Sequence, residues 1–434
     1  MKTGAGLFAI LAGLLSMPAA AQDKGVPAGK VIFYPSLEVN FQSEDNVFLL
    51  NEKDPLSGEV QSAQQYYVAH FKWEMPFSKS KTSIDWSPSY RDFSSSSVSL
   101  PDKFSQSLRV DSELNFSNGS RIRIEDRFIR DNITVREVAN SEVPFGTDTF
   151  RSNDFGFGFD YPILANQRIG GEVRSRILKF SNKSDPGFFD STGLDLTAKY
   201  EYDPSPVNTV TVEYRFGDTD QDRRQSGTNL VAEDFVENSI HLSWKGTGNR
   251  RVNYELRGGL QSLRFKRSDD SDFSGAVGDV RILYHLTPLS VLRGRATREA
   301  FSSFFDAANY YVSNHVEMVF EREISERVSW NVRGDFRLNR YPDSIQNLSG
   351  SYAPSLGLKR KDRLGSLEAR LDYQFYRTLS VGAFVRYERR DSNVIAEIDP
   401  DGPPPTGGPL SLVQFPQFDY ESTRIGFQVR FGWQ

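Results

Sequence analysis

Histidine is the side chain that most often moves protons or binds metals near neutral pH, and this chain has four of them. They are His70, His241, His285 and His315. A hydrolase built on a β-sheet needs a histidine beside a nucleophile or an acid. His315 lies two residues from both Ser313 and Glu317, so the three side chains would share one face of a strand. Such spacing also arises by chance, and the sequence favours water-exposed histidines inside the protein over an active site.

Other patterns that carry chemistry are absent from the sequence. There is no glycine-rich phosphate loop and no cluster with metal-ligand spacing, and the chain contains no cysteine. The acidic segments Asp218–Asp222 and Asp269–Asp272 could hold Ca²⁺ at a cell surface, but their spacing is irregular and favours solvated loops. We therefore predict a protein that is not an enzyme and that has no cofactor and no resident metal. The net charge of -5, with 25% charged residues, gives no reason to expect a nucleic-acid partner.

Arginine, aspartate and glutamate recur at every second position along many short segments. Arg109, Asp111 and Glu113, for example, alternate with Val110 and Leu114. This period of two is that of a β-strand with one polar and one apolar face. The pattern predicts strands at 31–41, 65–75, 80–88, 104–116, 120–130, 149–161, 167–179, 193–203, 208–217, 237–246, 250–263, 275–286, 290–299, 310–322, 327–340, 364–376, 378–390 and 419–433.

The composition is typical of a membrane barrel. Mean hydropathy is -0.50, and beyond the N-terminus no apolar run approaches the roughly 20 residues of a membrane helix. Aromatic residues nevertheless reach 13% of the chain. A barrel wall meets lipid only at every second residue, so its average polarity stays high. Aromatic residues at the ends of predicted strands fit the girdles that barrels carry at the membrane interfaces. A second set of aromatic residues forms one row within a single predicted strand. The first group is Tyr67, Trp73, Trp86, Trp244 and Trp433, and the row is Phe155, Phe157, Phe159 and Tyr161.

The links between predicted strands alternate between short and long along much of the chain. Residues 162–166 and 204–207 form short links, whereas 42–64, 131–148 and 391–418 form long ones. Antiparallel neighbours joined in this way place all short turns at one end. Outer-membrane barrels have short periplasmic turns and long outside loops. We therefore predict an all-β fold, a transmembrane antiparallel up-and-down barrel of about 18 strands, with outer-membrane lipid around it.

The register of the strands follows from the cost of charges in lipid. An Arg or Lys on the lipid face costs about 2–4 kcal/mol at the midplane, so the charged positions must face the lumen. They could form cross-strand ion pairs that stiffen the wall, or a track that contacts a passing substrate, and both can hold for different residues. The candidate lumen-lining residues are Arg121, Arg123, Arg174, Arg176, Arg257, Arg281, Arg293, Arg295, Arg333, Arg337, Arg370, Arg386, Glu113, Glu172, Glu213, Glu255, Asp279, Asp335 and Asp372.

Both ends of the chain carry export signals. Lys2, the apolar run Leu7–Leu15 and Ala19-Ala20-Ala21 predict a signal peptide at 1–21 that is cleaved near Ala21. A short periplasmic segment at 22–30 and a barrel at 31–434 would follow. The last strand resembles the terminal signal read by the barrel-assembly machinery, although it ends in Gln434 instead of Phe. The alternative is an ordinary last strand. The signal positions are Gly426, Val429, Phe431 and Trp433, with Arg424 as the preceding polar residue.

The start of the mature chain resembles the opening of the β-barrel porin 2 family. The residues are Phe33–Val39, Asp45–Phe48 and, less closely, Asp85–Tyr90, in which Trp86 stands where the family has Tyr. Pro35 and Asn46 match motif positions, and they could equally be an edge-strand proline and a turn-capping asparagine. The resemblance implies an outer-membrane barrel associated with exopolysaccharide or capsule export, with polysaccharide and periplasmic export components as partners. It brings no catalytic residues.

Two main hypotheses on function follow. In the first, the barrel exports an exopolysaccharide through its charged lumen or assists that export. The alternative is a general or modestly selective diffusion porin for small solutes. A barrel enzyme or an adhesin is a third option, but the spacing of the histidines and the moderate loop lengths argue against both.

Overall fold

The computed structural model describes residues 26–28, 30–45, 62–94, 103–131, 149–181, 190–221, 234–266, 272–303, 308–344, 357–398, 413–416 and 419–432. Within these ranges the chain forms β-strands and tight turns, and it contains no helix that is long and apolar enough to cross a membrane. The predicted signal peptide at 1–21 lies outside the described residues, and its cleavage stays a prediction.

The strands form one antiparallel sheet that closes on itself. The sheet has 19 strands, and all but the short β1 follow one another around a closed barrel of 18, in which β21 pairs with both β18 and β2. The strands are β1 (Val26–Ala28), β2 (Val31–Glu44), β3 (Ser62–Phe77), β4 (Ser80–Phe93), β5 (Phe104–Asn115), β6 (Arg121–Asp131), β7 (Phe150–Leu164), β8 (Gln167–Phe180), β9 (Ser191–Ser205), β10 (Asn208–Gln221), β11 (Phe235–Asn249), β12 (Val252–Phe265), β13 (Phe273–Thr287), β14 (Ser290–Ser302), β15 (Tyr310–Ser325), β16 (Val328–Ser344), β17 (Lys359–Tyr376), β18 (Leu379–Ser392), β19 (Ile395–Ile398), β20 (Val413–Pro416) and β21 (Tyr420–Gly432).

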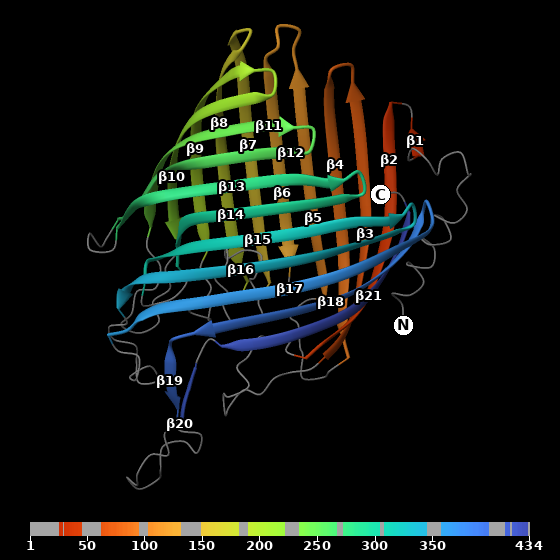
Figure 1. Cartoon of the computed structure of the whole chain (residues 1–434), viewed down its shortest axis with the longest axis vertical. Coiled ribbons are helices and arrows are strands. Elements are labelled where there is room, and N and C mark those ends of the chain that lie inside the picture. Colours follow the sequence, from red (N-terminus) through yellow and green to blue (C-terminus); the bar gives the residue numbers. More distant parts are fainter. Residues whose placement is uncertain are drawn as a thin grey trace.

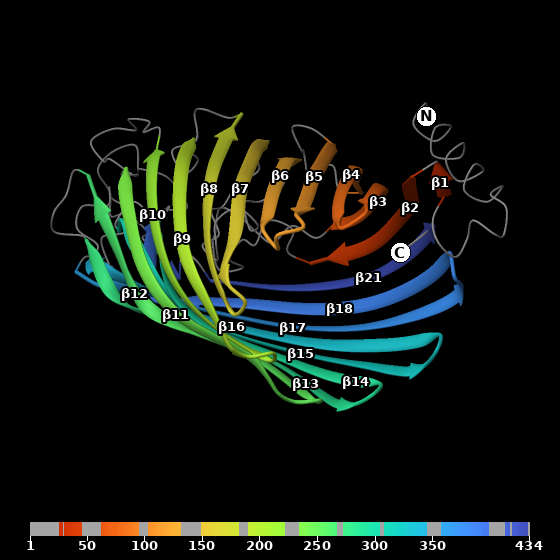
Figure 2. The ribbon, with the colours of Figure 1, turned by 90° about the horizontal axis from the view of Figure 1, so that it is seen from above.

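The figures show how this sheet surrounds an interior. In Figure 1 the strands β13–β18 run across the strands β2–β8 that lie behind them, as expected for two facing walls of tilted strands. Figure 2 shows β3–β9 and β13–β18 as facing walls with space between them. Closure leaves no open edge among the 18 described strands of the barrel, which is what a sheet in hydrocarbon requires. The predicted fold class and strand number are confirmed.

Short and long links alternate without exception around the barrel. Eight tight turns, among them 78–79 between β3 and β4 and 206–207 between β9 and β10, lie at one end, which we call the turn end. The long links, such as 45–61 and 222–234, start and finish at the opposite, loop end. In outer-membrane barrels short turns face the periplasm and long loops face outside. The predicted asymmetry is confirmed.

The two faces of the wall differ as the period of two requires. Large apolar side chains are exposed on the outer face; Leu242, Leu260 and Ile425 are 58%, 62% and 60% exposed. The predicted aromatic row on β7 belongs to this face, since Phe155 to Tyr161 are 40–50% exposed at alternate positions. A continuous apolar belt of this kind is stable only against hydrocarbon. The chain is therefore a membrane-spanning barrel of the outer-membrane type.

Aromatic pairs lie near both ends of the barrel, with Phe150–Phe180 and Phe235–Phe265 at the loop end and others at the turn end. Trp244 meets the edge of Tyr254 at 5.5 Å between ring centroids, and Tyr254 covers Gly246, where an added Cβ would lie 2.8 Å from its hydroxyl oxygen. Trp73 and Trp244, two of the predicted girdle residues, belong to such pairs, and their place at the boundary between lipid and water stays a prediction. The predicted girdle residue Trp433 lies outside the described residues. Three further pairs are Phe33–Trp73, Phe320–Trp330 and Tyr373–Phe375.

The structure extends the predicted strands and adds three short ones. Strand β17 starts at Lys359 instead of 364, because the run Lys359–Arg363 is charged on both faces and carries no apolar alternation. Beyond a bilayer the period of two is no longer imposed, so we expect such polar extensions to lie outside the lipid. Strand β1, which pairs with β2 in the segment predicted as a plain periplasmic linker, and the hairpin β19–β20 were not predicted.

Four long links are closed at their bases by the same hydrogen bond. In each, an aspartate just before one strand accepts a hydrogen bond from a backbone N–H at the end of the preceding strand. Asp190 accepts from Phe180 at 2.8 Å, and Asp234 accepts from Gln221 at 2.8 Å. These caps satisfy terminal donors where the ladder ends. The other two are Asp272 with Phe265 and Asp419 with Ser392.

Candidate functional site in the barrel interior

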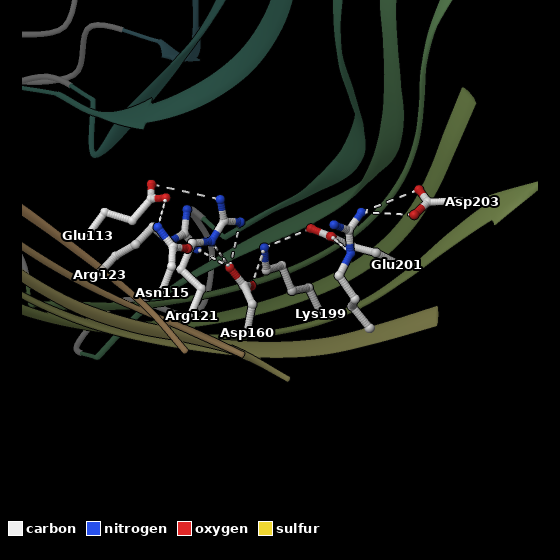
Figure 3. A network of polar contacts seen from close by, with 9 residues as sticks. Glu113, Asn115, Arg121, Arg123, Asp160, Lys199, Glu201 and Asp203 are labelled. Carbon is white, nitrogen blue, oxygen red and sulfur yellow. Dashed lines mark hydrogen bonds and ion pairs between the residues drawn. The ribbon is translucent and has the colours of Figure 1, made fainter. Parts of the chain in front are cut away.

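A network of ion pairs crosses the turn-end half of β5–β9, and we call it the Asp160 network (Figure 3). Asp160, on β7, is 3% exposed and receives Arg121 of β6 at 2.7 Å and Lys199 of β9 at 2.8 Å. Arg123 lies 3.5 Å from the same carboxylate. Gly170 makes room for this meeting, because a Cβ there would lie 2.5 Å from Asp160 Oδ1 and 2.6 Å from Lys199 Cε.

The network continues toward β10 without a gap. Lys199 also binds Glu201 at 2.7 Å, and Arg168 of β8 joins Glu201 at 3.2 Å to Asp203 at 3.0 Å. The Thr209 hydroxyl of β10 donates to Asp203 at 2.7 Å. Figure 3 shows the side chains from Glu113 to Asp203 in one line across the strands. Each strand is thereby tied to its neighbours beyond its backbone ladder.

Further along the same wall, in the middle of the barrel, arginines and carboxylates each bind more than one partner. Arg174 binds Asp154 and Glu172, each at 2.8 Å, and also Glu125 at 3.1 Å. Asp195, 4% exposed, joins two arginines: Arg176 at 2.9 Å and Arg215 at 3.3 Å. Glycines lie beneath these side chains; a Cβ at 156 would be 3.3 Å from the Arg174 guanidinium.

A cavity of about 790 Å³ lies between the two walls and reaches the loop end at Ser191, Gln221 and Ser302. Its charged lining is mostly cationic, with six arginines and four carboxylates. One wall contributes Arg127, Arg176 and Arg215, and the facing wall contributes Arg295, Arg333 and Arg337. The carboxylates are Asp154, Glu237, Glu299 and Glu317.

A second cavity, of about 750 Å³, starts at the turn end beside Pro206 and Val207. It extends along β11–β15 to Arg295 and Glu317, which also line the first cavity. The two spaces therefore adjoin at these two residues. We call the side chains around this junction the neck: Asp279, Arg281, Arg295, His315, Glu317, Arg333, Asp335 and Arg337.

The neck is built on four consecutive strands, β13–β16. Arg295 and Glu317 are direct cross-strand partners on β14 and β15. Arg295 binds Asp279 of β13 at 2.8 Å, and Arg281 binds the same carboxylate at 2.6 Å. Arg333 of β16 binds Glu317 at 3.1 Å. Alternating charges on adjacent strands thus meet face to face at the junction of the two cavities.

His315 lies beside two of the three carboxylates of the neck, Glu317 and Asp335. Its Nε2 contacts Asp335 Oδ2, and Arg337 Nε lies 3.2 Å from the other oxygen of Asp335. Ligand atoms of His315, Glu317 and Asp335 all lie within 4.8 Å of one another. The sequence pointed to His315, Ser313 and Glu317. The structure adds Asp335, which a strand partner supplies and which spacing along the chain could not reveal.

A contact between a histidine and a serine, which the sequence did not predict, joins β3 and β4. His70 Nδ1 lies 3.0 Å from Ser87 Oγ, across β3 and β4. Ser87 donates its hydroxyl proton to Asp85 at 3.1 Å, so the acid contacts the serine instead of orienting the histidine. A catalytic triad needs the reverse order. His241, by contrast, packs on Gly259, where a Cβ would lie 2.7 Å from His241 Nδ1.

The structure divides the predicted lumen-lining residues among three settings. Arg121, Arg123 and Glu113 belong to the Asp160 network, where Glu113 lies 3.9 Å from Arg121. Three further pairs form ion pairs away from this network: Arg174 with Glu172 at 2.8 Å, Arg257 with Glu213 at 2.6 Å and Arg386 with Glu368 at 3.7 Å. Most of the remaining predicted residues line cavities. The first cavity is lined by Arg176, Arg295, Arg333 and Arg337, the second by Glu255, Arg281, Arg293 and again Arg295, and a third, of about 330 Å³ at the turn end, by Arg370 and Asp372. Asp279 and Asp335 form ion pairs with arginines of the neck.

Two cavity-lining arginines were left out of the predicted set. Arg127 and Arg215 have the same parity as Arg123 and Glu213, so the alternation itself could have identified them. In the first acidic segment, two of the described aspartates bind a lysine. Asp218 and Asp220 both bind Lys266, at 2.9 and 2.8 Å, and they raise the pKa of this lysine. Asp269 lies outside the described residues.

The predicted insertion signal lies in the strand that closes the barrel. Phe384 of β18 packs on Gly426, where an added Cβ would lie 2.4 Å from its ring. The ladder between β2 and β21 begins at Ser36, one residue after Pro35, which has no N–H to donate. Arg424 binds Glu44 at 2.9 Å across this closure. Recognition of Gly426, Val429 and Phe431 by an assembly machinery stays a prediction, and Trp433 lies outside the described residues.

Comparison with known proteins finds likeness in solved structures alone. No family model and no curated protein matches the chain, so the resemblance to the β-barrel porin 2 family gains no support. Similar structures include OccAB3 of Acinetobacter baumannii (11% identity, 92% of this chain and 99% of that one, TM-score 0.44) and the outer membrane protein OpdK of Pseudomonas aeruginosa (11%, 92% and 99%, 0.45). The FrpB iron transporter of Neisseria meningitidis is another (8%, 96% and 83%, 0.44). The assignment as an outer-membrane barrel rests on the closed sheet and its apolar belt.

Proposed function

We propose that the barrel is a passive channel through which small polar solutes cross the outer membrane. The observation that carries this proposal is the meeting of two cavities at Arg295 and Glu317, one open toward the loop end and the other toward the turn end. Together they give a polar path along the barrel. Their volumes, about 790 and 750 Å³, lie in the range of about 300–1,000 Å³ that suits small molecules.

The charges along this path favour anionic solutes. Arginines outnumber carboxylates in the lining of the first cavity, and the second carries Lys245, Arg281, Arg293 and Arg295 against Glu255 and Glu317. Walls of low dielectric concentrate the field of such side chains and raise the local concentration of counter-ions. We therefore expect anions to pass more readily than cations of the same size.

Reconstitution in a planar bilayer tests this function. The mature chain should produce steady open conductance, and a KCl gradient should give a reversal potential of the sign expected for chloride preference. Liposomes with the protein should swell in small anionic solutes faster than in cationic ones of the same size. A folded barrel that does not conduct and does not support swelling would contradict the proposal.

Polysaccharide export, the first sequence-based hypothesis, rests on the resemblance alone. Nothing in the described geometry favours a polymer over a small solute. Deleting the gene distinguishes the two functions: a polymer exporter predicts polysaccharide held in the periplasm, whereas a small-solute channel predicts unchanged surface polymer and slower uptake of its solutes.

A further inference from the structure

We propose that the neck binds one divalent transition-metal ion, of the Zn²⁺ class, through His315, Glu317 and Asp335. These residues form the one group of three histidine or acidic side chains in the described part of the chain whose ligand atoms converge within 4.8 Å. All three are half-buried: their side chains are 14%, 23% and 12% exposed. The binding claim stands apart from the proposed channel function.

Strand geometry brings the ligands together on one face. His315 and Glu317 are two residues apart on β15, so both point into the barrel. Asp335 of β16 is the direct cross-strand partner of Glu317. Two carboxylates opposite each other repel and destabilise a strand pair. A cation between them and the imidazole removes this repulsion.

An arginine holds one oxygen of each carboxylate, and a metal ion bound to Asp335 and His315 would replace the proton that these two side chains share. Arg333 binds Glu317 Oε2 at 3.1 Å, and Arg337 lies 3.2 Å from Asp335 Oδ1. The other oxygen of Asp335 is the one that contacts His315. Metal-ligating carboxylates in proteins are commonly oriented by such outer hydrogen bonds. The arginine charges also offset the two carboxylates, so we expect reversible binding and not a tight structural site.

The donor set selects the class of metal. One imidazole nitrogen with two carboxylate oxygens suits Zn²⁺ and its neighbours among the transition metals, whereas Mg²⁺ and Ca²⁺ prefer oxygen ligands alone. Three protein ligands leave a coordination position open. His315 and Glu317 both line the first cavity, so this position would face water and any passing anion.

Occupancy would change the properties of the neck. Glu317 belongs to both cavities, and an ion bound to it lies where the path continues from one to the other. Bound Zn²⁺ would add positive charge and occupy space there. We expect it to reduce conductance and to increase anion preference in a channel that is open.

Zinc content after equilibrium dialysis of the detergent-purified mature barrel tests the binding claim. The probe is ZnCl₂ in the presence of excess MgCl₂, and the variants are His315→Gln, Asp335→Asn and, as a matched control, His285→Gln. His285 lies on β13, which pairs with neither β15 nor β16, and it is outside the three-residue group. The wild type and His285→Gln should retain one more equivalent of zinc than His315→Gln and Asp335→Asn. Equal zinc in all four, or an equal loss in His285→Gln, would overturn the proposal.

Two further measurements keep the result interpretable. A shift in gel mobility that appears only on boiling should be the same in all variants, which shows that each is a folded barrel. In planar bilayers, Zn²⁺ should reduce the conductance of the wild type and leave His315→Gln unchanged. If the barrel does not conduct at all, the proposed channel function fails while the dialysis result still decides the metal site.

Discussion

The Asp160 network and the neck are built from the same residue types on opposite walls, yet they differ in how completely their charges are paired. Asp160 is 3% exposed and is surrounded by Arg121, Arg123 and Lys199. Glu317 is 23% exposed, binds Arg333, and lines both cavities. The buried Asp160 ties its neighbouring strands together through three cations, whereas the partly paired charges at the junction of the two cavities are the ones that we propose meet a solute or an ion.

The largest effect is expected from the centre of the network. Asp160→Asn leaves three cations without their shared carboxylate in a half-buried place, and we expect the free energy of unfolding to fall by about 2–3 kcal/mol. Urea unfolding in detergent micelles measures this. The matched change Glu317→Gln should cost less than about 1 kcal/mol, because its ion pair is well hydrated. Equal losses in the two variants would remove the distinction between the regions.

Removing one aspartate cap measures how much stability is lost with a single hydrogen bond outside both regions. Asp234→Ala removes the acceptor for the Gln221 N–H, and we expect a loss of about 1 kcal/mol. The measurement is the same urea titration. A loss as large as that of Asp160→Asn would mean that the network adds nothing beyond ordinary hydrogen bonds.

Ion selectivity should respond to the neck and not to the network. Arg295→Gln removes a charge that lines both cavities, and we expect the anion-to-cation permeability ratio to fall about twofold, since the neck lies where the field acts on the permeating ion. Arg121→Gln, in the Asp160 network, should leave the ratio unchanged. Reversal potentials in a KCl gradient measure both, and a larger change in Arg121→Gln would reverse the roles assigned to the two regions.

The smallest effect is expected from an exposed ion pair at the loop end. Lys266 binds Asp218 and Asp220, which raise its pKa above the ordinary value of 10.5. A raised pKa means that the contribution is fully present below pH 10.5 and is lost as the pH rises through the higher folded-state pKa. Lys266→Gln should therefore lower the free energy of unfolding only slightly, and by the same amount at about pH 6 and about pH 8. Added salt should abolish the difference in stability between this variant and the wild type.

Most of the fold could be predicted from the sequence, because lipid imposes its period of two on every spanning segment. The 18 predicted segments correspond to β2–β18 and β21. Predictions became less accurate where the bilayer no longer acts. The polar start of β17 at Lys359, the short β1 and the hairpin β19–β20 carry no apolar alternation.

The candidate site could be predicted only in part. Alternation gives the face on which a charge lies, but the partner of each charge depends on the register between strands. The meeting of Glu317 with Asp335 and the contact of His70 with Ser87 are properties of that register. The aspartate caps could have been predicted from the sequence. Asp190 and Asp234 directly precede strands, where a side chain that accepts a backbone hydrogen bond is expected.

The proposed channel requires a water-filled neck whose charged face points inward, and single cysteines test this directly because the chain has none of its own. Glu317→Cys and Met318→Cys place a thiol on adjacent residues of β15, the first in both cavities and the second 53% exposed on the outer face. A charged methanethiosulfonate added to open channels should reduce the conductance of Glu317→Cys at once and leave Met318→Cys unchanged. A response of Met318→Cys with none from Glu317→Cys, or no response from either, would contradict the account.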